Sequence, residues 1–536
     1  MLIRLYLLYL NKEFFFEWNI YTFNSIKFNF LLLIDYKSLM FIFLVRIIFS
    51  IIIIYRIRYI DLSELKIDRF LYLIILFLIS MYILILRPNI LSIILGWDGL
   101  GLISYCLVIY YIKIKSFTSG IVTILLNRLG DIGLLLIIGL ITYYGRWNLS
   151  FYKINEFIII YILLIAFTKR AQIPFSTWLP IAMIAPTPVS SLVHSSTLVT
   201  AGIYLLIRYV NLLDFNYKNY IILISRLTIL FAGLVANFEL DLKKVVAYST
   251  LRQLGFIIRI LSIGSTELVF LHLFIHAIFK SLIFICVGRY IHYIYSNQDI
   301  RIYYGMYYIY PIKRIILIFS ILRLCGFPFL VGYYSKDLII EIFFFRKIIY
   351  FSIINLIIGT IFTVSYSFRI ILVLTRKFLI INVIYRKEDK IICISMIIII
   401  IFSLIYRKLI FNLINFNLLG INLLIIYKLI VFKIIIVGLI IGFNFYKLIL
   451  LNNKIGYFKI SFLFINLIYK IIYKKIIIIM FTYEVYIEKS IIEILSRKFI
   501  SVTLNIHELK ISNLMINIYL TILIYLIYLL IYLMNF

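Results

Sequence analysis

Acidic residues are scarce in this 536-residue chain, which has 22 Asp and Glu against 53 Lys and Arg and a formal net charge of +31. Such an excess of basic residues usually indicates nucleic acid or an anionic membrane surface as the partner. Here, however, the basic residues are scattered through apolar runs and form neither a patch nor a groove with interleaved aromatic residues. We therefore expect no binding of nucleic acid.

Cysteines are few, and they are far apart. Cys106, Cys286, Cys325 and Cys393 form no CxxC motif, whereas structural zinc and iron–sulfur clusters need clustered thiolates. No GxGxxG or P-loop string follows a strand-like segment either. The sequence thus predicts four small buried cysteines and no metal or cofactor bound by this chain, which disfavours a self-contained redox enzyme.

Polar stretches are also rare. Hydrophobic residues make up 65% of the chain and charged residues 14%, with a mean hydropathy of +1.12. A soluble domain has about 45–50% apolar and roughly 25% charged residues. Apolar runs such as 30–55, 70–86 and 90–112 can cross a hydrocarbon core of about 30 Å. The sequence therefore predicts an all-α polytopic membrane protein, surrounded by lipids, with about fifteen transmembrane helices.

Composition changes along the chain and suggests how it is organised. The segment 1–10 is apolar but too short to span a membrane, so we expect either an interfacial segment or a truncated first helix. Most of the Gly, Pro and His residues and the most distinctive strings lie between 95 and 341. The more polar stretch 483–512 fits either an amphipathic interfacial helix or an ordinary loop. We expect five segments: N-terminal helices (1–69), a core (70–380), accessory transmembrane helices (381–482), the polar stretch (483–512) and a final span (513–536).

Two ionisable residues lie in or beside the apolar runs of the core. A charge within a spanning helix costs about 2.5–3.5 kcal/mol, so it must be paired, hydrated or functional. Asp98 lies in LGWDGLG, and Lys169 follows a run in AFTKRAQIPFSTWLP. Burial disfavours a charged lysine and a nearby carboxylate favours it, so a moving carboxylate would switch its protonation. The alternative for each residue is a helix-end side chain that extends to the interface.

One predicted helix carries three titratable residues on a single face. His272, His276 and Lys280 occur in HLFIHAIFK at i, i+4 and i+8, within reach of a shared file of water. This spacing favours a proton relay. A structural histidine network is the alternative. Zinc is disfavoured because no Glu lies beside the first histidine and no third ligand is near.

Prolines interrupt two predicted spans. Pro186 and Pro188 precede His194, and Pro328 precedes Lys336 and Asp337 in GFPFLVGYYSKDLIIE. Proline frees backbone carbonyls, which is tolerated only where protein or a watery cavity satisfies them. Two such segments, each near a lysine, are the pattern of inverted-repeat transporters. We predict helix breaks at 184–189 and 327–332, with Lys169 and Lys336 in related positions; ordinary proline kinks are the alternative.

With these residues, the chain resembles the antiporter-like subunits of respiratory NADH:ubiquinone oxidoreductase (complex I). The resemblance covers about 70–374. It is carried, in the family's order, by LGWDGLGLISYCLVIYY, NRLGDIGLLLIIGL, KRAQIPFSTWLPIAMIAPTPVSSLVHSSTLVTAGIYLLIR, ANFELDLKKVVAYSTLRQLG, HLFIHAIFKSLIFICVG and LCGFPFLVGYYSKDLIIE.

The resemblance implies a fold and a set of site residues. The fold is two inverted five-helix repeats with discontinuous helices, followed by a C-terminal lateral helix, at 483–512 here, and an anchoring span. Asp98 takes the place of the family's buried acid and Lys169 that of its partner. Lys280 and Lys336 take the places of the central and distal lysines. The other positions that the resemblance implies are the relay residues His194, His272, His276 and Asp337, and the supporting residues Arg128, Asp131, Lys243, Pro186, Pro188 and Pro328.

The implied activity belongs to a complex of many subunits. The chain would translocate protons across the mitochondrial inner membrane while partner subunits carry FMN and iron–sulfur clusters and pass electrons from NADH to ubiquinone. Other membrane-arm subunits would be its partners. The alternatives are a subunit of a multi-subunit cation/proton antiporter, which shares the core, and a scaffold that pumps nothing.

Some arginines stand where the resembling family has serine. Only nine methionines accompany very many isoleucines. A translation table that reads AGA as Arg and ATA as Ile, where some invertebrate mitochondria read Ser and Met, would produce both features. An unpaired arginine at mid-bilayer costs about 3 kcal/mol. Our hypothesis is therefore that serine is the natural residue at seven positions, the alternative being a truly basic chain: Arg87, Arg146, Arg170, Arg252, Arg259, Arg289 and Arg323.

Overall fold

A computed structural model gives the fold of this chain. It describes residues 13–23, 26–59, 67–142, 147, 156–294, 297–328, 330–345, 350–375, 388–414 and 430–451. These residues belong to a compact unit, Met1–Phe462, whereas the second unit, Leu463–Phe536, lies outside them. The predicted lateral helix at 483–512, the anchor at 513–536 and Arg146 also fall outside the described residues.

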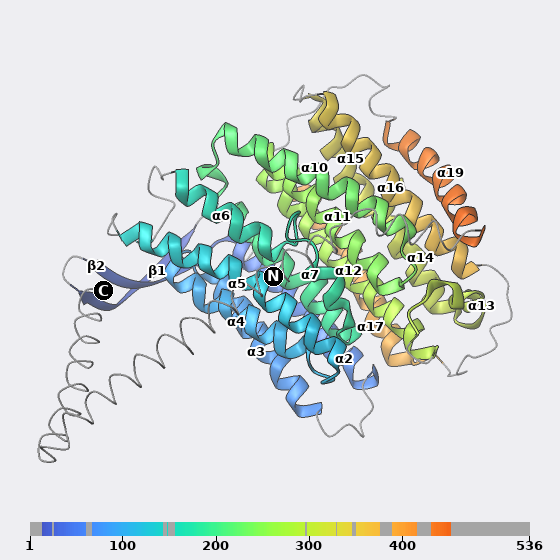
Figure 1. Ribbon diagram of the computed structural model, residues 1–536, viewed down its shortest axis with the longest axis horizontal. Helices are drawn as coiled ribbons and strands as arrows, with labels where there is room; N and C mark the ends of the chain where they lie inside the picture. Colours follow the sequence, from blue (N-terminus) through green and yellow to red (C-terminus); the bar gives the residue numbers. More distant parts are fainter. Residues whose placement is uncertain are drawn as a thin grey trace, which may run out of the picture. The chain divides into compact units, whose positions relative to one another are not determined.

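Helices make up most of the described chain (Figure 1). Nine of the described helices are long and apolar enough to cross a membrane, which supports the predicted membrane protein. The longer helices are α2 (Tyr36–Tyr59), α3 (Ile67–Leu86), α4 (Ile90–Val108), α5 (Ile114–Ile141), α6 (Glu156–Lys169), α9 (Leu198–Arg208), α10 (Phe215–Phe238), α11 (Leu242–Ser262), α12 (Thr266–Tyr293), α14 (Pro311–Cys325), α15 (Val331–Phe345), α16 (Tyr350–Thr375), α17 (Lys390–Ile414) and α19 (Ile430–Leu451).

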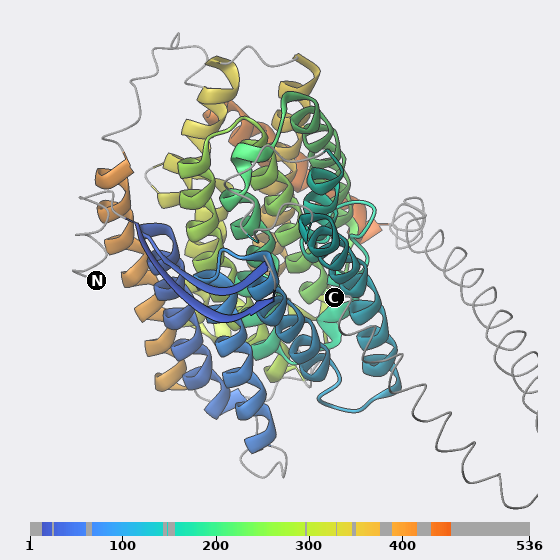
Figure 2. The ribbon, with the colours of Figure 1, turned by 90° about the vertical axis from the view of Figure 1, so that its left-hand side faces the viewer.

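The N-terminal region departs from the all-α prediction. Strands β1 (Phe14–Phe23) and β2 (Ile26–Ile34) pair in an antiparallel hairpin, in a region for which the sequence predicted helices. β2 packs on α2 and α3, and Leu31 and Leu33 are buried (Figure 2). These strands are rich in aromatic and β-branched residues, which favour strands. Hydropathy alone does not distinguish such a segment from a spanning helix.

The first predicted helix break is confirmed. The short α7 (Trp178–Ile181) and the 3-10 helix η3 (Ala182–Ile184) end where Ala185 and Pro186 take extended ψ angles of 155° and 150°. The chain resumes as α8 (Thr187–Val189), the π-helix η4 (Ser190–Thr197) and α9. Pro186 disfavours helical geometry in the residue before it, which places the break at Ala185.

The second predicted break is confirmed as well. Helix α14 ends at Cys325 and is capped by Gly326, whose φ of 83° is left-handed and favours glycine. Helix α15 begins at Val331, after Pro328. Lys169 is the last residue of α6, whereas Lys336 lies within α15, so one lysine precedes an irregular segment and the other follows one.

Helix α12 is the centre of the described unit. Nearly all of its apolar stretch is buried, and the helix packs against α2, α11, α14, α15, α17 and η4. Figure 1 shows it between the N-terminal helices and those that follow it in the sequence. Because α12 carries His272, His276 and Lys280, these side chains lie deep in the packed helices.

Candidate functional site

A first charged cluster lies between α4, α5 and α6. Lys169 is buried, and its Nζ donates to the backbone oxygen of Trp97 at 3.4 Å. The same ammonium lies 5.1 Å from the centroid of the Trp97 ring, a cation–π distance. A Cβ on Gly101 would lie only 3.3 Å from Nζ. Helix α4 therefore offers the lysine a carbonyl, an aromatic face and the space left by a glycine.

Two carboxylates accompany Lys169, and Arg128 bridges them. Arg128 Nη1 lies 3.7 Å from Asp98 Oδ2 and 3.4 Å from Asp131 Oδ2. Both carboxylates lie close enough to interact electrostatically with Lys169. The Asp98 side chain is 35% exposed and that of Asp131 10%. Asp98 is therefore the more exposed of the two acids in the described chain, and apolar flanking residues in the sequence do not reveal which helix face a side chain occupies.

A second cluster surrounds α12 and contains bases. Lys280 donates to the Ser249 hydroxyl of α11. His272 Nδ1 lies 3.1 Å from Ser335 Oγ of α15, and its Nε2 lies 3.5 Å from Gln253 Oε1 of α11. Burial and hydroxyl or amide partners thus replace the carboxylates of the first cluster. The predicted shared face of α12 brings these groups together.

Lys336 joins this cluster from α15. Its Nζ donates to the backbone oxygen of Leu324, at the end of α14 where the helix stops. A Cβ on Gly326 would lie 3.1 Å from the Lys336 side chain. The neighbouring Asp337 interacts with Tyr333 of the same helix. The second break therefore supplies both a carbonyl and the space that the lysine uses.

Two buried histidines have ring nitrogens without hydrogen-bond partners among the described residues. Among the described residues, neither nitrogen of His194 or of His276 has a hydrogen-bond partner, and each residue is 1% exposed. The His194 ring lies beside Trp178, with centroids 6.1 Å apart. Buried polar groups are normally paired. These imidazoles are therefore the places in the site where a transferable proton or an internal water molecule fits.

Lys243 connects the first helix break to α11. It is buried, and its Nζ donates to the backbone oxygen of Ala185 at 3.2 Å. This carbonyl lies where Pro186 interrupts the helix, and a cation there complements the helix C-terminal dipole. Further along α11, Ser249 and Gln253 contact the second cluster. Helix α11 therefore touches the break and the bases.

The arginines for which the sequence suggests serine differ in their binding partners. Arg170, Arg252 and Arg259 are each at most 1% exposed, and in the described chain none lies within ion-pair distance of a carboxylate. Arg289 pairs with Asp389 at 3.1 Å. Arg323 is also buried and donates to the Ser403 hydroxyl. In contrast, Arg208 makes a two-pronged bond to Asp35 at 2.6 and 2.7 Å.

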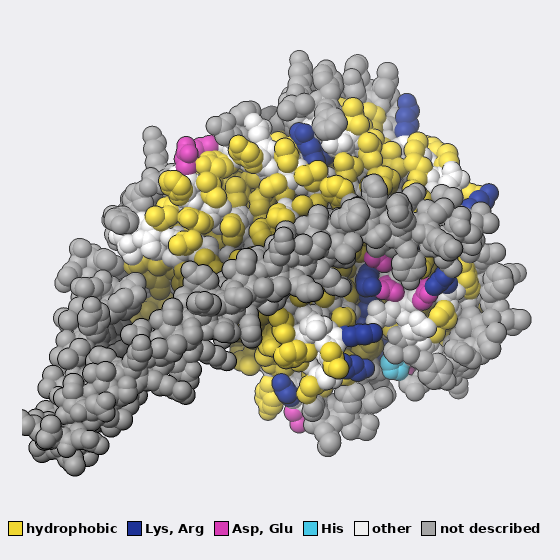
Figure 3. All heavy atoms as spheres, in the orientation of Figure 1, with side chains coloured by type: hydrophobic (Ala, Val, Ile, Leu, Met, Phe, Trp, Pro, Cys, Tyr) yellow, Lys and Arg dark blue, Asp and Glu magenta, His cyan; other side chains and the backbone are white. Residues whose placement is uncertain are grey.

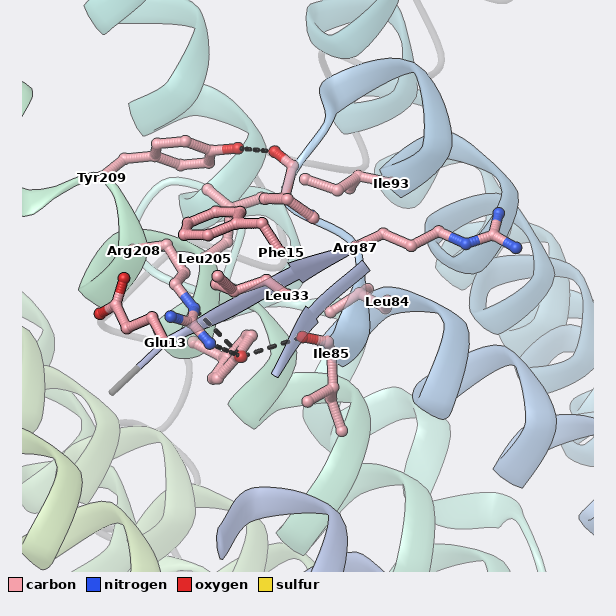
Figure 4. Close-up of a pocket in the computed structure, with 12 residues that line it drawn as sticks. Glu13, Phe15, Leu33, Leu84, Ile85, Arg87, Ile93, Leu205, Arg208 and Tyr209 are labelled. Carbon is pink, nitrogen blue, oxygen red and sulfur yellow. Dashed lines mark hydrogen bonds between the residues drawn. The ribbon is translucent and has the colours of Figure 1, made fainter. Parts of the chain in front are cut away.

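Neither the cysteines nor the cavity extends the site. Cys286, Cys325 and Cys393 are buried as predicted, whereas Cys106 is partly exposed. A cavity of about 330 Å³ lies among β1, β2, α3, α4 and α9 (Figure 4). Its hydroxyls are already bonded, Tyr204 to the Ile85 oxygen and Tyr209 to the Pro88 oxygen, each at 2.9 Å. No sequence motif indicated this cavity.

Comparison with known proteins assigns the chain to a family. The family described as NADH:quinone oxidoreductase/Mrp antiporter, TM, matches residues 88–363. This chain belongs to that family of antiporter-like membrane subunits.

Particular relatives sharpen the assignment. The chain is 86% identical over 536 residues, 100% of its own length and 97% of the relative's, to NADH-ubiquinone oxidoreductase chain 5 of Apis mellifera ligustica. It is 48% identical over 378 residues to chain 5 of Anopheles quadrimaculatus, covering 69% of this chain and 66% of that one. The resemblance to complex I is therefore confirmed, and with it the membrane location.

A solved structure shares the fold. A chain of the Mrp complex from Dietzia sp. DQ12-45-1b matches with a TM-score of 0.70 and 23% identity, over 83% of this chain and 52% of that chain. At this identity the likeness concerns the fold alone.

Proposed function

We propose that this chain is a proton-translocating subunit of the membrane arm of respiratory complex I, in the mitochondrial inner membrane. Partner subunits would hold FMN and iron–sulfur clusters and reduce ubiquinone with NADH. The observation that carries the proposal is the alignment of buried bases on α12 (His272, His276 and Lys280) in a chain with full-length similarity to chain 5.

The first cluster would act as the switch. Lys169 contacts the uncharged carbonyl oxygen of Trp97 and lies near two carboxylates. Arg128 contacts both of them, Asp98 at 3.7 Å and Asp131 at 3.4 Å. Such distances are longer than those of a tight ion pair, so Arg128 can exchange between the two acids at little cost. When a carboxylate approaches Lys169, the ammonium is stabilised; when the carboxylate returns to Arg128, Lys169 releases its proton.

The second cluster would pass the proton on. Lys280, His276 and His272 follow each other at one-turn spacing, and Lys336 reaches the same region from α15. The hydroxyls of Ser249 and Ser335 can both accept and donate, so they can hand on a proton. The unmatched nitrogens of His194 and His276 are where internal water would complete the route. The two helix breaks would belong to two inverted repeats within 70–380.

The environment of the helices fits this location. Large apolar side chains are exposed along α3, α4 and α5, and Figure 3 shows that hydrophobic side chains cover most of the described surface in that view. Lipids and neighbouring membrane-arm subunits would cover them. A subunit of a cation/proton antiporter is the second candidate, since the family and the shared fold include such complexes. The full-length similarity to chain 5 favours complex I.

The test is Lys169→Met in the assembled, purified complex. We expect NADH:quinone turnover to persist in the presence of an uncoupler, with fewer protons moved per electron in proteoliposomes. The matched control is Lys244→Met, because Lys244 is a half-exposed lysine paired with Asp241. An unchanged number of protons moved per electron in the assembled Lys169→Met complex would refute the proposal. Transport that depends on sodium would also refute it and would support the cation/proton antiporter instead.

A further inference from the structure

A buried lysine outside both clusters has an unusual environment. Lys313, near the start of α14, is fully buried and donates to the hydroxyl of Tyr293 on α12. Its Nζ lies 4.4 Å from the centroid of the Tyr293 ring and 5.1 Å from that of Tyr310. The two rings stack with centroids 4.2 Å apart. The ammonium is thus held by two aromatic faces and one ionisable hydroxyl.

Carboxylates adjoin this lysine and reach the surface. Glu388 and Asp389 directly precede α17, and both lie close enough to Lys313 to interact with its charge. The Asp389 side chain is 38% exposed. A buried cation therefore lies near two acids, of which Asp389 reaches solvent and pairs with Arg289 at 3.1 Å. Neither the first nor the second cluster uses these acids.

Helix α14 links this site to the distal lysine. Lys313, Ser320 and Leu324 are separated by seven and four residues, which places them on one face of the helix. Lys313 and Ser320 are buried, and the Leu324 oxygen accepts the bond from Lys336. The distance from Lys313 to Leu324 along the axis is about 16 Å, with Ser320 between them. Helices α12, α14 and α17 pack pairwise around this face (Figure 1).

We propose that Lys313, Tyr293 and the pair Glu388 and Asp389 form a terminal proton-exchange site between Lys336 and the aqueous surface. The proposal rests on the proposed function. Lys336 gives its proton, through Ser320 and internal water, to neutral Lys313. Lys313 then gives a proton to the Tyr293 oxygen as that hydroxyl releases its own to Asp389, and Asp389 gives it to water. One proton moves and no electron does.

The experiment compares substitutions at Lys313 in the purified whole complex, with turnover and protons per electron measured in proteoliposomes. We expect Lys313→Met to lower the proton ratio to the level of Lys169→Met while uncoupled turnover stays within about twofold. Lys313→Arg keeps the positive charge and the contact with the rings but cannot release a proton. We therefore expect it to fail as Lys313→Met does. The control Lys244→Met should pump normally.

Each outcome decides a different point. Normal pumping by Lys313→Arg would show that the lysine is only a structural cation and would overturn the exchange site. If Lys313→Met does not assemble, Tyr293→Phe and Asp389→Asn supply the readout, and normal pumping by both would also overturn it. If Lys169→Met lowers the number of protons moved per electron and the Lys313 variants do not, the exchange site is refuted and the proposed function stands. If none of these variants lowers that number, the proposed function is refuted.

Discussion

The two clusters differ in the chemistry that surrounds their lysines. In the first, Lys169 lies near two carboxylates and an arginine, and three of the four side chains retain some exposure. In the second, Lys280, Lys336 and His272 are buried and bond to hydroxyl, amide and carbonyl oxygens. The difference teaches that one cluster can rearrange fixed charges, whereas the other must avoid holding several charges at once. This difference fits the switch that we propose for the first cluster and the transfer of single protons that we propose for the second.

The largest effect is expected from glycine substitutions that test how each cluster is built. A Cβ on Gly332 would lie 1.9 Å from the backbone oxygen of Arg323, which cannot move aside without shifting α14 against α15. Gly332→Ala should therefore cost about 3 kcal/mol or more and prevent stable assembly. Gly101→Ala meets only the flexible end of Lys169 at 3.3 Å, so the complex should assemble and pump less. Assembly is measured by native electrophoresis; equal assembly of both variants would contradict the comparison.

Next in size is the removal of the central base. Lys280→Met should abolish proton movement through this chain. Lys280 is the lysine of α12 that contacts Ser249 and lies one turn from His276, and no other lysine on this helix can replace it in passing a proton between them. Quinone reduction with an uncoupler present should continue. The measurement is the proton-to-electron ratio, with Lys244→Met as the control. Full pumping by the assembled variant would show that the second cluster carries no protons.

A smaller and sharper contrast concerns the two acids of the first cluster. Asp131 is more buried than Asp98, and its carboxylate therefore acts on Lys169 with less screening by solvent. We expect Asp131→Asn to lower the proton ratio several-fold more than Asp98→Asn. Both ratios should be measured at several salt concentrations. A larger loss in Asp98→Asn would instead give the main role to Asp98, the acid predicted from the sequence.

The smallest change concerns the identity of single buried arginines near the two clusters. Arg252 acts electrostatically on Lys280, Lys336 and His272, and its Nε and Nη1 have no partner among the described residues. A fixed cation there opposes a cluster that must carry protons, whereas serine would bond its own helix backbone. We expect peptide mass spectrometry of the natural protein to find serine at Arg170, Arg252 and Arg259. Arginine at these positions, or CGN codons for them, would end the hypothesis.

The sequence predicted some features because one residue type determines them locally. Pro186 and Pro328 predicted the helix breaks, and the spacing of His272, His276 and Lys280 predicted the buried face of α12. Other features depend on partners distant in the sequence. The pairing of Arg128 with two acids and the bond from Lys243 to Ala185 arise only when helices pack. Lys313 gave no signal at all, because a lysine two residues after a proline has the sequence of an ordinary helix start.

Helix α11 holds the carbonyl of Ala185 through Lys243 at one point and Lys280 through Ser249 at another. The two residues of α11 are six positions apart, which is about 9 Å along a helix. Over so short a length a packed helix moves as a stiff rod. A shift of the broken segment must therefore either stretch the Lys243 bond or push Ser249 relative to Lys280. In the proposed function, a displacement of the helix break would thus act on Lys280 of the second cluster mechanically, without any charge crossing the space between them.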